Sequence, residues 1–347
     1  MHQWHQFLQA SSSHPLVLDN EKIMCFGDSH AEIQATQSGS VICDLSHLGL
    51  LQIQGEDAIT FLQGQVTNDV KQLNGHLAHY TAYCSPKGRM LALFLAFAHH
   101  DHLHLQLPKE LVASIAKRLK MYVMRSKVEI TDVSESIIKI GISGQNAAEL
   151  LKPHFSIVPK TDYQLVSLEN GAVLKLPGTL PRYEIFTDIN SAKLIWNDLC
   201  LDTVKVGAPC WDWLEIQAGI PEVTLNTQEQ FVPQMLNLDL LGAINFKKGC
   251  YTGQEIVART HYLGTVKRRT YLAQINTAVQ PKAGDDVLND TGEVVGKVVR
   301  SAITSMDRYD LLVEIRLESV ESGKVFVEGN ALAIKPLPYA VQAKNSP

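Results

Sequence analysis

The hydrophobic pattern of this chain changes between residues 265 and 270. Before that point, apolar positions follow helical and strand spacings in an irregular order, whereas after Lys267 they alternate in short runs broken by turn residues. These later runs predict strands at residues 269–275, 293–302, 309–315 and 324–334. We therefore expect an α+β body over residues 1–266 and a small all-β domain over residues 267–347.

The body mixes helices and strands without regular βαβ repetition. A hairpin is indicated by the apolar strand 91–98 and the alternating segment 102–107. Pro108 then opens a helix whose buried side carries Leu111, Ile115, Leu119 and Tyr122. Further strands are expected at 41–45, 128–131, 137–142, 171–176 and 183–187, and further helices at 57–64, 192–200 and 212–218. Residues 1–40 are polar and rich in Gln, Ser and His, so we expect them to pack loosely.

Composition and charge exclude several classes of protein. The chain has 347 residues, 45% of them hydrophobic, which is enough for a sizeable core. A formal net charge of -5 argues against a surface coated in positive charge to hold a long nucleic acid. The longest apolar run, Met90–Ala98, is about half as long as the roughly 20 residues of a membrane span. The first residues lack the features of a secretory signal, so we expect a cytoplasmic protein.

One cysteine stands out from the others. The six cysteines are scattered, with no Cys-x-x-Cys pair and no spacing typical of a zinc or iron–sulfur site. Cys250, however, follows Lys247 and Lys248 and lies between two glycines. Glycines let a backbone approach a ligand closely, and the two lysines would favour the thiolate form. The alternative is a solvated basic segment around a buried structural cysteine.

Positive charge is concentrated around that cysteine. The segment from Gly242 to Thr270 contains six Lys or Arg residues and one acidic residue, a net charge of +5. Such a segment favours an anionic partner such as a polyglutamate tail, a phosphate or an RNA backbone.

Two further polar features allow more than one interpretation. The histidines at 99, 100, 102 and 104 suggest a metal site, but alternation places His102 and His104 on the outer face of a hairpin strand, so we expect a polar hairpin tip. Glu184 lies in a strand of mostly apolar residues, where it either faces solvent or is a ligand carboxylate in a pocket. The chain contains no nucleophile elbow, Walker loop or dinucleotide-binding glycine motif.

The cysteine segment reads Lys247-Lys248-Gly249-Cys250-Tyr251-Thr252-Gly253-Gln254-Glu255, followed by Ala258-Arg259 and residues 264–268. This motif closely resembles the signature of the YgfZ family, folate-binding relatives of the glycine-cleavage T-protein, an aminomethyltransferase. Three other stretches agree with the family, at residues 61–69, 83–89 and 218–234. The resemblance runs in order from about residue 40 to the C-terminus.

The resemblance implies a T-protein-like ring of two α/β subdomains plus a C-terminal β-barrel, built around a pocket for tetrahydrofolate or a one-carbon-substituted folate. It makes Cys250 and Lys248 the signature functional residues. It also places Glu184 where the T-protein carboxylate holds the pterin, whose amino and ring N–H groups suit bidentate bonding to a carboxylate. The other residues expected to contact the cofactor are Tyr83, Asn68, Arg259 and Lys247.

The chain departs from the T-protein at two places. The T-protein has acidic residues after its turn, including an Asp thought to assist methylene transfer, where this chain has Ala92 and Leu93. Glu215 stands at the T-protein's arginine position, which anchors the folate tail, and the basic residues Lys247, Lys248 and Arg259 could replace that anchor.

Three functions follow from these observations. The family implies an accessory protein that maintains iron–sulfur enzymes, including a tRNA methylthiolase, through folate and Cys250. The thiolate could attack a one-carbon unit, accept a sulfur or iron species, or serve as a redox thiol. Its partners would be folate, transient iron–sulfur clients and, weakly, tRNA. The alternatives are a one-carbon transferase acting on an amine or RNA, and a module that recruits RNA through the +5 segment.

Overall fold

The structure is a computed structural model that describes residues 2–341 except 170, 263 and 265. Its contacts divide the chain into two units that interleave along the sequence. The first unit contains residues up to 58, then 72–79 and 95–214, and the second contains 59–71, 80–94 and the residues from 215 onward. The expected domain boundary at residues 266 and 267 stays a prediction, because this division groups the C-terminal residues with parts of the body.

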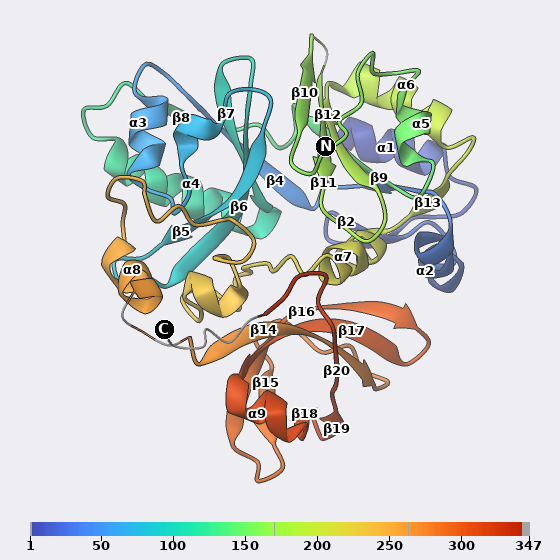
Figure 1. Cartoon of the computed structure of the whole chain (residues 1–347). Coiled ribbons are helices and arrows are strands. Elements are labelled where there is room, and N and C mark those ends of the chain that lie inside the picture. The colour runs from blue at the N-terminus through green and yellow to red at the C-terminus, as the bar shows by residue number, and fades with distance from the viewer. Residues whose placement is uncertain (1, 170, 263, 265, 342–347) are drawn as a thin grey trace. The chain divides into compact units, whose positions relative to one another are not determined.

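Six strands form the main sheet of the first unit, in the order β10-β11-β12-β9-β3-β13 (Figure 1). Neighbouring strands are antiparallel except β13, which runs parallel to β3. One face packs on three helices, where Trp4 and Trp196 are buried. The strands are β3 (Val41–Asp44), β9 (Ile138–Ser143), β10 (Leu165–Leu168), β11 (Gly171–Leu176), β12 (Arg182–Thr187) and β13 (Val204–Val206), and the helices are α1 (His2–Ala10), α5 (Ala147–Leu151) and α6 (Ile189–Leu199).

A second sheet has the strand order β5-β6-β7-β4-β8, and the division between the units falls within β5 and within β6. Its strands are β4 (Leu48–Gln54), β5 (Ala78–Cys84), β6 (Met90–His99), β7 (His102–Pro108) and β8 (Glu129–Asp132). The predicted hairpin is confirmed as β6 and β7. The predicted helix is α4 (Lys109–Val123), which buries Leu111, Ile115 and Leu119. Tyr122 was expected on the buried side and is 41% exposed instead, because it lies in the last turn of the helix.

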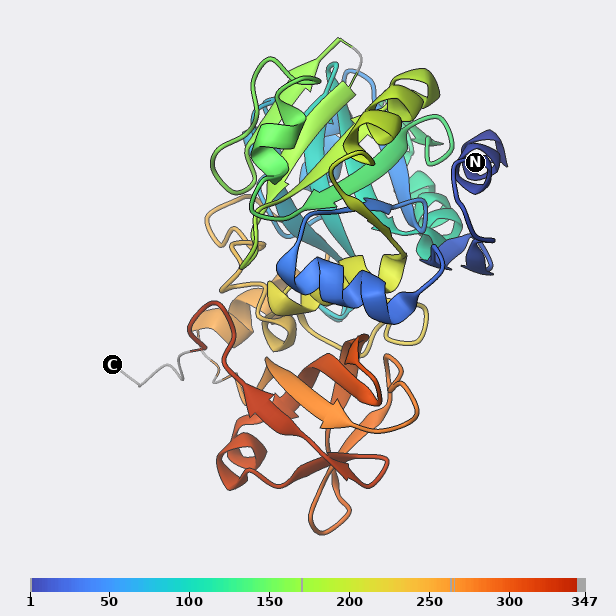
Figure 2. The same cartoon turned by 90° about the vertical axis from the view of Figure 1, so that its right-hand side faces the viewer.

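The C-terminal strands form a seven-stranded sheet in the order β19-β18-β15-β16-β17-β14-β20. Its end strands β19 and β20 are neighbours in the sequence, and the sheet curls into a nearly closed barrel around an apolar core (Figure 2). This confirms the predicted α+β class with a C-terminal β-barrel. The strands are β14 (Arg268–Asn276), β15 (Asp286–Asn289), β16 (Val294–Ser305), β17 (Arg308–Arg316), β18 (Val325–Val327), β19 (Asn330–Ala331) and β20 (Ala333–Lys335), with the helix α9 (Leu317–Ser322) after β17.

The expectation of a loosely packed N-terminus is wrong. Residues 2–38 contain α1, the hairpin β1 (Val17–Asp19) and β2 (Lys22–Cys25), and the helix α2 (Ser29–Ser38). Trp4 and Leu8, one helical turn apart, are both fully buried, because that spacing puts them on the same face of α1.

The histidine cluster also differs from its expected placement. His104 is buried rather than on an outer face, and its ring stacks on Phe97 with centroids 5.1 Å apart. Burial, with the charges of His99 and His102, lowers the pKa of His104 to about 3. Among the described residues, no group of three or more His, Cys, Asp or Glu side chains could hold a metal ion. In the same part of the chain, no helix is long and apolar enough to cross a membrane.

Candidate functional site

The Lys248 side chain holds a turn of the second unit in place. Helix α3 (Ala58–Gln63) ends just before Gly64, and the chain then turns back. The Lys248 ammonium donates hydrogen bonds to the carbonyl oxygens of Gln63, Val66 and Asn68, at 2.8, 2.6 and 2.8 Å. Carbonyls after a helix end lack helical partners, and an ammonium group has three donors, so donors and acceptors match in number. Burial lowers the pKa of Lys248 to about 8.

Asn68 ties the same turn to two other segments. Its amide nitrogen donates to the carbonyls of Tyr80, at 3.1 Å, and Gly242, at 2.8 Å, while its amide oxygen accepts from the backbone N–H of Asp69. The neighbouring Thr67 hydroxyl donates to the carbonyl of Ala243 at 2.8 Å. The Asn68 side chain thus joins the turn to β5 and to the segment that leads into the cysteine motif.

Cys250 is the exposed cysteine of the six, all of which lie in the described part of the chain. Burial raises the pKa of Cys84 and Cys210 to about 12 and that of Cys200 to about 11. It also raises the pKa values of Cys25 and Cys43. The burial of the other thiols fits structural roles, and the alternative of a buried structural Cys250 is wrong.

The residues after Cys250 pack tightly on the turn between β5 and β6. A Cβ atom on Gly253 would lie 2.5 Å from the Ser85 carbonyl oxygen and 3.0 Å from the Cα of Gly88, and Gly253 has a φ of +82°. Only glycine fits such a close approach in the left-handed region. Helix α8 (Gln254–Tyr262) begins one residue later. The glycine predicted to permit close approach therefore permits contact with the protein's own backbone.

The other predicted residues of the second unit have different surroundings. Tyr83 is buried in β5 and stacks on Phe94, with ring centroids 6.4 Å apart. It also forms a β-bridge with Val66, whose carbonyl accepts from Lys248. Lys247 and Arg259 are exposed. The structure thus brings Lys248, Asn68 and Tyr83 to one turn.

Glu184 lies in the first unit and is only 2% exposed, so the solvent-facing interpretation is wrong. It stands opposite Gly141 of β9, and opposite residues of antiparallel strands project to the same face. The Trp211 ring, from helix α7 (Ala208–Gln217), covers that glycine, since a Cβ there would lie 2.6 Å from the ring. Arg182, two residues before Glu184, lies 5.8 Å from the centre of the same ring. Glu184 is therefore a buried carboxylate beside an aromatic ring.

A buried lysine shares this environment. Lys139 of β9 is 1% exposed and donates to the carbonyls of Ser134, at 2.9 Å, and Ile137, at 3.2 Å. Burial lowers its pKa to about 8, against the opposing pull of carboxylates that include Asp44 and Glu184. Sequence reasoning missed this lysine, because only strand register places it near Glu184. The sequence could have shown that Arg182 lies next to Glu184, because residues two apart on a strand share a face.

The positively charged segment 242–270 has fewer cationic side chains free to bind an anionic partner than its composition suggests. Arg268 pairs with Glu314 at 3.0 Å, Arg269 pairs with Asp239, and Lys248 is engaged by carbonyls. Three of the six cationic residues therefore have partners within the protein. The exposed ones are Lys247, Arg259 and Lys267.

The structure also shows the surroundings of the residues at which the chain departs from the T-protein pattern. Ala92 and Leu93 are buried apolar residues of β6. Glu215 is 7% exposed and lies 3.9 Å from the Arg300 guanidinium, an ion pair that connects α7 to β16 within the second unit. Arg300 was not singled out from the sequence, since no local pattern relates residues so far apart.

Comparison with known proteins defines the class. Residues 5–248 match the family described as the GCVT N-terminal domain. The glycine cleavage system aminomethyltransferase T from Bartonella henselae has a similar structure, with a TM-score of 0.80 over 96% of each chain at 16% sequence identity. The fold is thus that of the T-protein.

A curated relative narrows this class. The chain is 33% identical over 308 residues to the "tRNA-modifying protein YgfZ" of Enterobacter sp. (strain 638), covering 87% of this chain and 94% of that protein. The chain belongs to the YgfZ family.

Proposed function

We propose that this protein binds a tetrahydrofolate cofactor and supports the assembly or repair of iron–sulfur enzymes, including a tRNA methylthiolase, with Cys250 as its reactive thiol. The observation that carries the proposal is the contrast among the six thiols. Five have pKa values raised by burial, whereas Cys250 is exposed on a segment that Lys248 and Gly253 hold in place. The relative's name supports a role connected with tRNA modification.

The residues around Glu184 suit the pterin part of a folate. A buried carboxylate accepts two N–H bonds in one plane, which is the pattern that a pterin's amino and ring N–H groups offer. The Trp211 ring beside it provides an aromatic surface. When bound, the cofactor would supply one-carbon chemistry. Glu184 would orient it, and the expected binding of its tail by Lys247 and Arg259 stays a prediction.

In this proposal, Lys248 positions Cys250. Its ammonium is committed to three backbone carbonyls, two residues before the cysteine. Asn68 and Tyr83 act in the same way, since they fix the turn that supplies those carbonyls.

Aminomethyl transfer is a weaker alternative. Ala92 and Leu93 are buried and apolar where the T-protein carboxylates are expected, so no ionisable group assists the reaction from these positions. Recruitment of RNA through residues 242–270 is weaker too, since three of their six cationic residues have partners within the protein.

Folate binding is tested by titrating the full chain with tetrahydrofolate and following tryptophan fluorescence. Glu184→Gln keeps the shape of the side chain and removes its charge, and it should weaken binding by about tenfold or more. Glu149→Gln, at an exposed glutamate of the same unit, is the matched control. Equal affinity of wild type and Glu184→Gln would remove Glu184 from the cofactor site.

The thiol is tested separately, by complementation of a strain that lacks the protein. Cys250→Ser should fail to restore the activity of an iron–sulfur tRNA methylthiolase, whereas Cys200→Ser should restore it. Cys200 is half-buried and its pKa is about 11, so the control removes a thiol that is protonated at neutral pH. Full activity with Cys250→Ser would refute the role of Cys250.

A further inference from the structure

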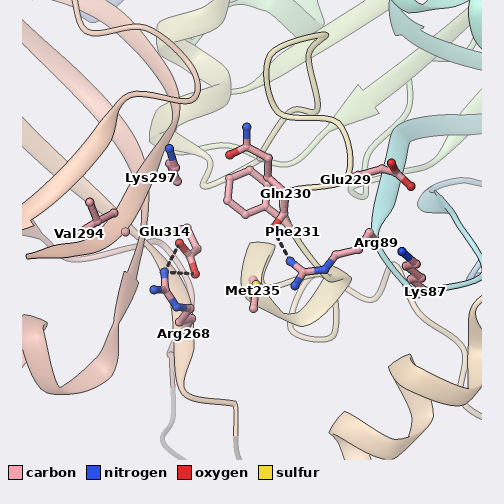
Figure 3. A pocket seen from close by; sticks show the side chains of 11 residues that line it. Lys87, Arg89, Glu229, Gln230, Phe231, Met235, Arg268, Val294, Lys297 and Glu314 are labelled. Atoms are coloured by element: carbon pink, nitrogen blue, oxygen red, sulfur yellow. Dashed lines mark hydrogen bonds and ion pairs between the residues drawn. The ribbon is translucent and has the colours of Figure 1, made fainter.

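A cavity lies within the second unit, between the β5–β6 turn and the barrel strands (Figure 3). Its volume is about 630 Å³, within the range of roughly 300–1,000 Å³ that small-molecule pockets occupy. Lys87 and Arg89 line it from the turn, Arg268 and Lys297 from the barrel, and Phe231 and Met235 from the segment between. It contains none of the residues assigned to folate or thiol chemistry.

The cavity is positively charged. Its lining has four cationic side chains and two carboxylates, those of Glu229 and Glu314. The Lys297 ammonium forms an ion pair with the Asp286 carboxylate, with Nζ and Oδ1 2.7 Å apart. Arg268 binds both oxygens of Glu314 through Nη1, at 3.2 and 3.0 Å. The cationic excess favours an anionic ligand.

Several donors in the cavity are available to a ligand. The Arg89 Nη1 atom donates to the carbonyl of Gln230 at 2.6 Å, which fixes the guanidinium. Among the described residues, Nε and Nη2 of Arg89 and of Arg268 have no hydrogen-bond partner, and the exposed Lys87 ammonium has none. The Arg89 guanidinium points toward the side of the cavity where Arg268 and Glu314 lie (Figure 3). Planar guanidinium groups bind phosphate oxygens in pairs, and lysine adds a point charge.

Backbone hydrogen bonds hold together the two segments that carry Arg89 and Phe231. The N–H of Met90 donates to the Phe231 carbonyl, and the N–H of Glu229 donates to the Met90 carbonyl, both at 2.8 Å. Arg89 directly precedes β6, whose first residue is hydrogen-bonded to the segment at residues 229–231, and these bonds fix the backbone next to Arg89. Phe231 and Met235 add apolar surface next to the charges.

We propose that this cavity binds a phosphate ester, with Arg89, Arg268 and Lys87 around the phosphate and the apolar residues beside its organic part. A phosphate monoester carries a charge of about -1.5 to -2 near neutral pH, which complements the cationic excess of the lining. A free nucleotide would supply the phosphate ester as a monoester, and the backbone of RNA would supply it as a diester. The proposal does not depend on folate binding or on Cys250.

The experiment measures binding to the full chain by calorimetry, with inorganic phosphate, adenosine 5′-monophosphate, adenosine, a short single-stranded RNA and tetraglutamate as probes. The monophosphate should bind saturably and adenosine at least about tenfold more weakly. Stronger binding of the RNA, with a steep salt dependence, identifies a backbone phosphate as the source; equal or stronger binding of the monophosphate identifies a free nucleotide.

Two variants and a control complete the test. Lys87→Ala removes an exposed side chain, so the fold should survive, and it should weaken phosphate-ester binding by about fivefold; Arg268→Gln should weaken it by about tenfold. Lys282→Ala, an exposed lysine of the same unit outside the cavity, should bind like wild type. The proposal is overturned if no phosphate probe binds, if tetraglutamate binds more tightly than all of them, or if Lys87→Ala and Arg268→Gln both bind like wild type.

Discussion

The Lys248 ammonium lies 2.8 Å from the backbone carbonyl oxygen of Asn68, a residue 180 positions earlier in the chain. The same nitrogen lies 5.2 Å from the centre of the Tyr251 ring. One side chain thus holds together the turn after α3 and the segment that carries Cys250.

Replacement of Lys248 by methionine should destabilise the protein. Methionine keeps the length of the side chain but leaves three carbonyls without their charged donor, at a cost of about 3 kcal/mol in the free energy of unfolding. Urea unfolding measures this loss. Lys247→Met, at the exposed neighbouring lysine, should change stability by less than about 0.5 kcal/mol. Equal stabilities of the two variants would show that the carbonyl contacts contribute little.

Alkylation of the native protein should modify a single thiol quickly. Cys250 is exposed, whereas burial both shields the other five thiols and raises their pKa values, and only the thiolate reacts. Intact-mass analysis after brief iodoacetamide treatment should find one adduct in wild type and none in Cys250→Ser. In urea, both proteins should react at all their remaining cysteines. A fast second adduct on the folded wild type would show that another cysteine becomes exposed.

The sequence predicted those parts of the fold whose signals are local. The hairpin β6–β7 and the helix α4 follow from alternation and helical spacing within about 30 residues, so their positions are close to those expected. Cys250 could be recognised as a functional candidate in the same way, from its neighbours and its motif. The carbonyl acceptors of Lys248 could not be predicted in this way, because residues 63, 66 and 68 are far from Lys248 in the sequence and come close to it only in the folded protein.

Burial was the property that sequence reasoning predicted least well. Glu184 could equally have faced solvent, and His104 was placed on the wrong face, because hairpin alternation does not tell which side a second layer covers. The polar composition of residues 1–40 likewise concealed Trp4, which packs on Trp196 with ring centroids 5.6 Å apart. The burial of these three side chains depends on residues that are distant in the sequence.

The buried His104 should make the protein less stable in weak acid. The unfolded chain binds a proton at this histidine near pH 6.5, whereas the folded chain does so only near pH 3, because of burial and the charges of His99 and His102. Below pH 6.5 the unfolded state therefore holds more protons, so stability falls as pH falls, by up to about 1.4 kcal/mol per pH unit.

The variant His104→Phe isolates this effect. Phenylalanine can stack on Phe97 but cannot bind a proton, so between pH 7 and pH 5 the variant should lose about 2 kcal/mol less unfolding free energy than wild type. Urea unfolding at both pH values gives the difference. His30→Phe, at an exposed histidine, should follow wild type. Parallel losses in wild type and His104→Phe would mean that His104 is protonated in the folded protein.

Trp4 should contribute to stability through a hydrogen bond as well as through packing. Its indole N–H donates to the buried carboxylate of Asp44 at 2.8 Å. Burial alone would raise the pKa of Asp44, but the His5 imidazole, 3.7 Å away, and hydrogen bonds from Trp4 and Ser46 outweigh it and lower the pKa. Trp4→Phe removes one of these donors from a buried charge, which should cost about 2 kcal/mol beyond the loss of ring contacts.

Trp196→Phe is the matched control for this hydrogen bond, because the Trp196 indole nitrogen is buried without a hydrogen-bond partner among the described residues. Both variants lose the same ring atoms, so the difference between their unfolding free energies measures the bond to Asp44. A carboxyl with a lowered pKa stabilises the folded state above its unfolded pKa of 3.8, and this contribution is lost as pH falls through the folded value. The difference between the variants should therefore be largest near neutral pH and shrink below about pH 3.8. A difference that is absent at neutral pH would show that Asp44 is held by His5 and Ser46 alone.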